Sequence, residues 1–191
     1  MSGAFPISTA KFGTLGIKSI QNTIISKSVS GKRLVRQIDN QRFAFTVQII
    51  TGTRSSTYGE LMAFIMKQRG QKETFTIIPP EIEDARGNES GSVLIDGVHA
   101  VGDTTILMNG FGSDGAGRFK AGDFLKFASH SKIYMVVADV TSSSNAATVT
   151  IEPPLLVALA NDSAVVYDNV PFTVALTTDV QEFGVSGADK D

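Results

Sequence analysis

The stretch Val170-Pro-Phe-Thr-Val-Ala-Leu-Thr177 determines the predicted topology of this chain. Phe172, Val174 and Leu176 alternate with small or polar residues, which is the pattern of a strand with one buried face. The same pattern occurs at Phe43–Ile50 and Thr74–Ile78, whereas the apolar runs just before residue 170 are shorter. The chain is therefore expected to return, near its C-terminal end, to a core that its earlier strands begin.

A helix is predicted between those two earlier strands, over residues 58–69. Thr57 and Glu60 have the spacing of a capping box, in which each side chain bonds the backbone N–H of the other residue. Gly70 is placed to end the helix. One apolar stripe at positions i, i+3, i+4 and i+7 is expected to pack on the sheet: Tyr58, Leu61, Met62 and Ile65.

Residues 82–168 differ in texture, because short apolar runs alternate there with turns of Gly, Asp, Asn and Ser. A turn recurs about every ten residues, which is typical of a small barrel or sandwich. The predicted strands are 93–95, 105–108, 124–127, 133–138, 147–151 and 164–167.

Proline marks the two ends of this block, at Pro79-Pro80 and at Val170-Pro171, as expected at a domain boundary. The predicted organisation is a core domain, residues 1–80 plus 169–191, that carries an inserted β-rich lobe, residues 82–168. The core begins with an extended arm, residues 1–41, with short strands expected at 16–19 and 34–38. The predicted fold class is mainly β: a β-sandwich core with one packed α-helix and an inserted small barrel or sandwich.

Composition excludes several classes of chemistry. The 191 residues are 42% hydrophobic and 19% charged, which is enough apolar content for a core. The chain has no Cys, which excludes disulfides and thiol nucleophiles, and only two His, which excludes a multi-His metal site. No apolar run approaches the roughly 20 residues that cross a bilayer, and the N-terminus lacks a secretory signal pattern. These features predict a protein that is not an enzyme and has no cofactor, metal or membrane partner.

Short motifs that could carry chemistry lack the context that this chemistry needs. Ser8-Thr-Ala-Lys11 has no helix signal, and Ser30-Gly-Lys-Arg33 lacks the leading Gly and final Ser or Thr of a phosphate-binding loop. Gly110–Gly117 offers one carboxylate, too few for calcium, and is predicted to be a flexible β-turn or loop tip. His99 and His130 are predicted to be surface or turn residues.

Charge is divided unevenly along the chain. Residues 1–80 hold 11 Lys/Arg and 3 Asp/Glu, and residues 81–191 hold 6 Lys/Arg and 16 Asp/Glu, so the two parts carry +8 and −10. No aromatic residue lies between Lys27 and Arg42, so direct nucleic-acid recognition is not expected. Two interpretations stay open: the charged parts are solvated surfaces with no partner, or they are opposite faces that meet when copies associate head to tail. The candidate subunit interface comprises Lys27, Lys32, Arg33, Arg36, Glu81, Glu83, Asp84, Asp179 and Glu182.

The order of these segments resembles small β-rich tail and baseplate proteins of long-tailed bacteriophages, the class that includes distal tail proteins. The resemblance covers residues 5–183 and is carried by Phe5-Pro6, Ser28–Arg33, Phe43–Ile50, Tyr58–Arg69, Val98–Gly102, Lys120–Asp123, Ile133–Val136, Ile151–Pro154 and Phe172–Leu176. It implies a tail-tube-like core and a virion structural protein that is made in the host cytoplasm. It also implies a homo-oligomeric ring, six-fold as in the family, that contacts tube, hub or fibre components.

A second hypothesis is a surface- or carbohydrate-binding β module associated with tail fibres. Carbohydrate sites generally use exposed aromatic platforms, and the chain has no Trp and three Tyr, at 58, 134 and 167. The ring-forming structural protein is therefore the favoured hypothesis.

Overall fold

The computed structural model describes residues 3–6, 11–38, 41–50 and 58–183. This part of the chain is mainly β with one helix, α1, which confirms the predicted fold class. The chain divides into two compact units, Lys11–Thr51 and the combination of Met1–Ala10 with Gly52–Asp191. Each unit is described by itself below.

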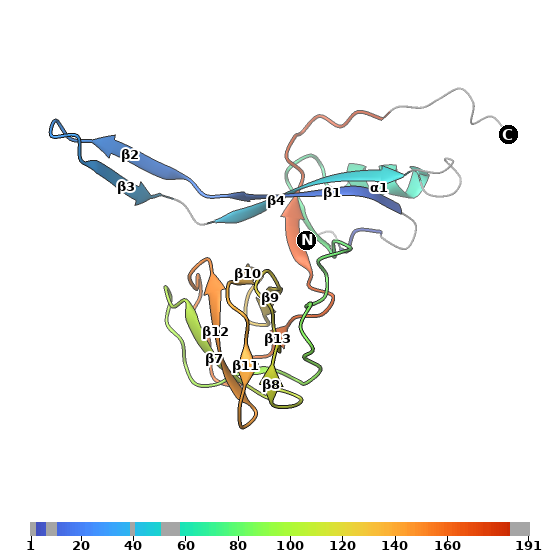
Figure 1. The fold of residues 1–191 in the computed structure, drawn as a ribbon. Coiled ribbons are helices and arrows are strands. Elements are labelled where there is room, and N and C mark those ends of the chain that lie inside the picture. The colour runs from blue at the N-terminus through green and yellow to red at the C-terminus, as the bar shows by residue number, and fades with distance from the viewer. Residues whose placement is uncertain (1–2, 7–10, 39–40, 51–57, 184–191) are drawn as a thin grey trace. The chain divides into compact units, whose positions relative to one another are not determined.

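The unit Lys11–Thr51 consists of two antiparallel pairs of strands (Figure 1). Strand β1, Lys11–Ile20, pairs with β4, Arg42–Ile50, and the register shifts between Phe12 and Thr14. Strand β2, Thr23–Lys27, pairs with β3, Arg33–Gln37, to form a hairpin.

The predicted arm therefore contains more strand than expected. The prediction of short strands at 16–19 and 34–38 missed most of β1 and all of β2. The bulge in β1 breaks the period-two alternation that identifies a strand. In β2 every residue is exposed, so the strand has no buried face and its sequence shows no alternation of apolar and polar residues.

In the second unit, α1 spans Gly59–Lys67 and precedes β5, Thr74–Ile77. The helix ends earlier than residue 69 because Arg69 and Gly70 have positive φ angles of 56° and 67°. Thr57 lies outside the described residues, and the N-cap residue Tyr58 makes no side-chain capping bond. Of the predicted stripe, Leu61 is buried and the other three residues are half-buried.

Two positions on the helix were not predicted to pack. Phe64 lies between Phe5 and Phe75, with ring centroids 5.6 and 5.3 Å away. Gln68 is completely buried, and its side-chain amide donates to the carbonyl of Phe64.

The C-terminal strand β14, Phe172–Ala175, pairs antiparallel with β5, with Phe172 opposite Ile77. Residues 172–175 therefore return to a strand almost one hundred positions earlier. Phe172 also meets Phe124, with ring centroids 5.4 Å apart.

Between β5 and β14, six strands form one sheet in the order β13-β9-β10-β12-β7-β6. The strands are β6 Leu94–Ile95, β7 Thr105–Asn109, β9 Phe124–Phe127, β10 Ile133–Val136, β12 Ala146–Glu152 and β13 Val165–Val166. The outer strands β6 and β13 meet, because Ile95 N–H donates to Ser163 C=O and Val165 N–H donates to Val93 C=O, both at 3.0 Å. The sheet is thus a nearly closed barrel.

Every predicted strand in this block overlaps an observed one. A further pair, β8 Gly115–Ala116 with β11 Thr141–Ser142, lies inside segments predicted as turns. Gly110–Gly117, predicted as a flexible β-turn or loop tip, thus also contains the two-residue strand β8. The carboxylate of Asp114 fixes this region by accepting the backbone N–H groups of Ser144 and Asn145, each at 2.8 Å.

Two turns of the barrel have the same construction. In Ala100-Val-Gly-Asp103 and Lys120-Ala-Gly-Asp123, the Asp Oδ2 accepts the N–H three residues earlier, at 2.8 Å in both. Each turn needs Gly at its third position, where φ is 96° and 98°. The residues that follow the two turns lead into β7 and β9, so the two similar sequences form the same kind of turn before a strand.

Candidate functional site

The four predicted basic interface residues lie together on the β2–β3 hairpin. Lys27 is the last residue of β2 and is directly opposite Arg33, the first residue of β3. Arg36 is opposite Ile24, and Lys32 closes the connection between the strands. None of the four makes an ion pair with another described residue. Residues 23–38 contain no Asp or Glu that could balance this charge locally.

The hairpin also exposes large apolar side chains. Ile24, Ile25, Leu34 and Val35 are each at least half exposed, at 53%, 50%, 54% and 55% of their possible surface. At the tip, Val29 is fully exposed. A monomeric protein rarely leaves such a group of aliphatic side chains in water without a function for them.

The tip itself is well ordered by hydrogen bonds. Ser28 N–H donates to Lys32 C=O at 3.0 Å, and Lys32 N–H donates to Ser28 Oγ at 3.2 Å. Gly31 N–H donates to Ser28 C=O, and Gly31 has a φ of 79°, which favours Gly. The hairpin therefore presents Val29 and its neighbours in a fixed turn.

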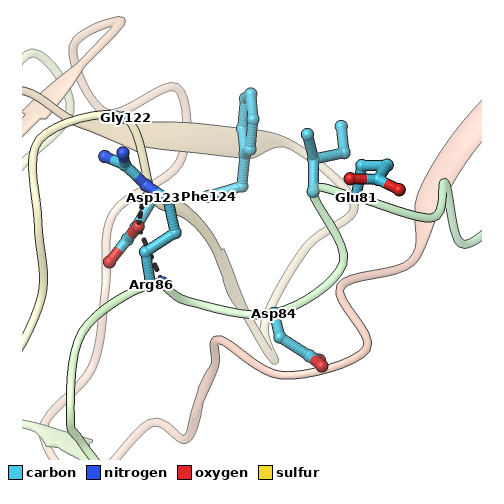
Figure 2. A pocket seen from close by; sticks show the side chains of 7 residues that line it. Glu81, Asp84, Arg86, Gly122, Asp123 and Phe124 are labelled. Carbon is cyan, nitrogen blue, oxygen red and sulfur yellow. Dashed lines mark hydrogen bonds and ion pairs between the residues drawn. The ribbon is translucent and has the colours of Figure 1, made fainter. Parts of the chain in front are cut away.

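Three of the predicted acidic residues lie in the connector that enters the barrel. Glu81 and Asp84 line a small pocket with Ile82, Arg86, Gly122, Asp123 and Phe124 (Figure 2). In Figure 2, Arg86 turns toward the buried Asp123, and the two side chains are 3.4 Å apart. Asp84 accepts the N–H of Asn169 at 2.8 Å. Glu83 is half-buried and its carbonyl accepts the N–H of Val170.

One carboxyl group beside the connector, that of Asp168, has a raised pKa. Asp168 lies next to Asn169 in the segment that runs back along the connector. Partial burial raises the pKa of Asp168, and the nearby charge of Asp84 adds to this effect. This edge of the unit is therefore crowded with negative charge.

The remaining two predicted acids lie in the segment after β14. Asp179 accepts the N–H of Gln71 at 3.0 Å, and its position is close to Gly70. Glu182 is exposed. The structure thus brings the basic candidates together on one hairpin and divides the acidic candidates between two segments.

A buried ion pair was missed by the sequence analysis. The Glu89 side chain is fully buried, and its Oε1 accepts the N–H groups of Ser90, Gly91 and Gly112 at 3.0, 2.6 and 2.7 Å. Its Oε2 lies 3.9 Å from Nη1 of Arg118. The sequence feature that could have indicated this ion pair is the isolation of Arg118, which is the only Lys or Arg between Arg86 and Lys120. This pair fixes loops at one end of the barrel.

The prediction of a surface position is wrong for His99, which is buried because the segments around residues 99 and 159 pair with each other. Its Nε2 accepts the N–H of Leu107 at 3.2 Å, so its role is structural. His130 lies in the predicted turn between β9 and β10, half-buried, with Nε2 2.8 Å from the Tyr134 hydroxyl. Burial lowers the pKa of His130, and the charge of Lys126 lowers it further.

Other candidate features carry no chemistry in the described residues. Residues 8–10 of the Ser8–Lys11 motif lie outside them, and Ser30–Arg33 is part of the hairpin. The described residues contain no group of three potential metal ligands and no helix that could span a membrane. Tyr134 and Tyr167 are buried, and Tyr58 packs against Phe183, so the tyrosines do not form a carbohydrate platform.

Comparison with known proteins identifies the barrel segment. Residues 83–170 match the family model of the B domain of the distal tail protein pb9. No curated protein sequence matches the chain. The matched residues include all six strands of the barrel. The match confirms the resemblance to distal tail proteins and supports a structural role in a bacteriophage tail, as a component of the virion.

Proposed function

We propose that copies of this chain form a ring around or at the end of the tail tube and connect neighbouring tail components. The premise is the distal tail B domain at residues 83–170. By resemblance the ring contains six copies, and its neighbours are tube, hub or fibre proteins. In this proposal the protein has no catalytic role and needs no cofactor.

The β2–β3 hairpin is the observation that supports self-assembly. A two-stranded hairpin that exposes all its residues is only marginally stable by itself in water. Its aliphatic side chains and its unpaired strand edges become favourable when another chain covers them. The hairpin thus has the properties of an arm that is completed by a neighbour.

Charge supports a neighbour of the same kind. A ring uses heterologous contacts, in which one surface of a subunit meets a different surface of the next. The basic arm carries Lys27, Lys32, Arg33 and Arg36, and the predicted partners are Glu81, Glu83, Asp84, Asp179 and Glu182. Each exposed ion pair contributes only about 0–1 kcal/mol, so several of these cations must be reversed together for a severe loss of incorporation into tails.

We further propose that residues 82–168 form a lobe inserted into a core of residues 1–80 and 169–191. The main hydrophobic cluster supports this division, because its buried members all lie between Val93 and Tyr167. The lobe is then free to contact other tail proteins while the core forms the ring.

The test reverses Lys32, Arg33 and Arg36 together to Glu and measures incorporation of the protein into tails. We expect severe loss of incorporation with the fold retained by circular dichroism. The matched control reverses Lys67, Arg69 and Lys72, three exposed cations of the other unit, and should incorporate normally. Normal incorporation of the hairpin variant would show that this basic group has no role in assembly. Electron microscopy of purified tails would test the ring and its number of copies.

A further inference from the structure

The register of the hairpin gives its two faces different chemistry. Residues opposite each other in an antiparallel pair share a face. One face carries Lys27 opposite Arg33 and Ile25 opposite Val35, and we name these four residues the clamp face. The reverse face carries Ile24 opposite Arg36 and Ser26 opposite Leu34.

Lys27 and Arg33 form an unfavourable pair within the chain. Like charges directly opposite in a sheet destabilise it. A nearby carboxylate would reduce the repulsion between these two cations, but residues 23–38 contain none. Neither cation has an ion pair among the described residues. A carboxylate supplied from outside would remove this repulsion.

We propose that the clamp face binds a carboxylate-bearing segment of a second copy of this chain. This inference rests on the proposed ring and names the contact that builds it. The Arg33 guanidinium can hold a carboxylate through two N–H groups, while Lys27 adds a point charge. Ile25 and Val35 lie on the same face and can bury the apolar part of the same segment.

The connector at residues 81–84 is the segment of the second copy that fits. It contains three carboxylates and one aliphatic residue, Ile82, within four positions. Glu81 and Asp84 are exposed, and neither makes an ion pair. Burial, and after it the charge of Asp84, raises the pKa of Asp168, so a further carboxyl group lies close to the connector.

Lys27→Glu distinguishes a contact between copies from a role inside the hairpin. It replaces the like-charge pair with an opposite-charge pair, so it should slow hydrogen exchange of the hairpin amides in the isolated subunit. The same substitution should weaken association of full-length subunits, measured by sedimentation equilibrium, by about tenfold or more. Lys18→Glu makes an equal charge change at an exposed position of β1 in the same unit, outside the basic group, and should weaken association much less.

Cysteine trapping tests the partner, since the natural chain has no Cys. Ile25→Cys protein is mixed with Asp84→Cys protein carrying a mass tag, so any mixed disulfide joins two copies. Ile24→Cys, on the reverse face, is the matched control. We expect mixed dimers with Ile25→Cys at several times the yield of the control. Equal yields, or no mixed dimer at concentrations where wild-type subunits associate, would overturn the proposal.

The outcome is separable from the proposed function. Mass spectrometry of purified virions reports whether the wild-type protein is a tail component. If the protein is present but Lys27→Glu associates like wild type, or Lys18→Glu loses as much, the clamp face is wrong and the tail role stands. If wild-type subunits do not associate at any concentration, a second copy is not the occupant.

Discussion

The barrel and the β2–β3 hairpin are both made of short antiparallel strands, but they differ in how far the strand residues are buried. In the barrel, β7 and β12 alternate exposed and buried residues, and the sheet nearly closes on itself where β6 meets β13. In the hairpin both strands are exposed along their full length. The barrel buries its apolar side chains within itself, whereas the hairpin leaves its apolar side chains exposed.

This difference teaches that strand propensity and burial are separate properties of a sequence. Ile24 and Ile25 favour a strand as strongly as Ile133 does, but only Ile133 is buried. A β-branched run without alternation is therefore a signal of an interface as much as of a core strand.

The largest expected effect comes from cutting the chain. Residues 82–168 expressed alone should fold cooperatively, because their hydrophobic cluster is contained within them. Residues 11–51 alone should lack a cooperative transition, since their hairpin buries no apolar face. Urea titration monitored by circular dichroism measures both. A disordered 82–168 fragment would contradict the predicted domain division.

Single substitutions sharpen the same contrast. Phe119 is completely buried against Phe111 and Tyr167, so Phe119→Ala should lower the free energy of unfolding by about 3–5 kcal/mol. Val35→Ala in the hairpin should change it by less than about 0.5 kcal/mol in the isolated subunit. The measurement is the shift of the urea midpoint at constant m-value. A hairpin effect as large as the barrel effect would mean that the hairpin is already covered within one subunit.

A smaller loss is expected from the buried ion pair. Glu89→Ala leaves three backbone N–H groups without their acceptor and Arg118 without its ion-pair partner, which should cost about 1–3 kcal/mol. Glu89→Gln keeps an acceptor of the same size and should retain part of this stability. Urea denaturation of the two variants provides the comparison. Equal losses would show that the charge, and not the accepted N–H groups, is what stabilises these loops.

The smallest effect is a pH dependence that belongs to the barrel. The pKa of His130 is lower in the folded protein, so the unfolded chain binds more protons as the pH falls through about 6.5. The stabilising contribution is therefore complete above this pH and decreases below it. His130→Gln should reduce the change of the urea midpoint between pH 7.5 and pH 5 relative to wild type. A wild-type slope that persists in the variant would assign the effect to another group.

Sequence patterns predicted the barrel strands because burial imprints alternation on them. They failed for β2, which has no buried face, and for β8 and β11, which are two residues each. The helix stripe was recognised, but Gln68 was not, because a polar side chain was not counted in the apolar stripe, although its position three residues after Ile65 continues that stripe. The basic candidates are neighbours in sequence and could be grouped in advance. The opposition of Lys27 and Arg33 depends on the hairpin register, which only the structure provides.

The meeting of β6 and β13 has a consequence for solubility. An open sheet edge can recruit the edge of another molecule and begin aggregation, and a closed barrel removes that hazard. Lobes of this kind can be crowded together at high local concentration without templating one another into shared sheets. Val165→Pro would remove the N–H that bonds to the carbonyl of Val93 and so separate β6 from β13. The exposed strand edges would then promote aggregation of the protein.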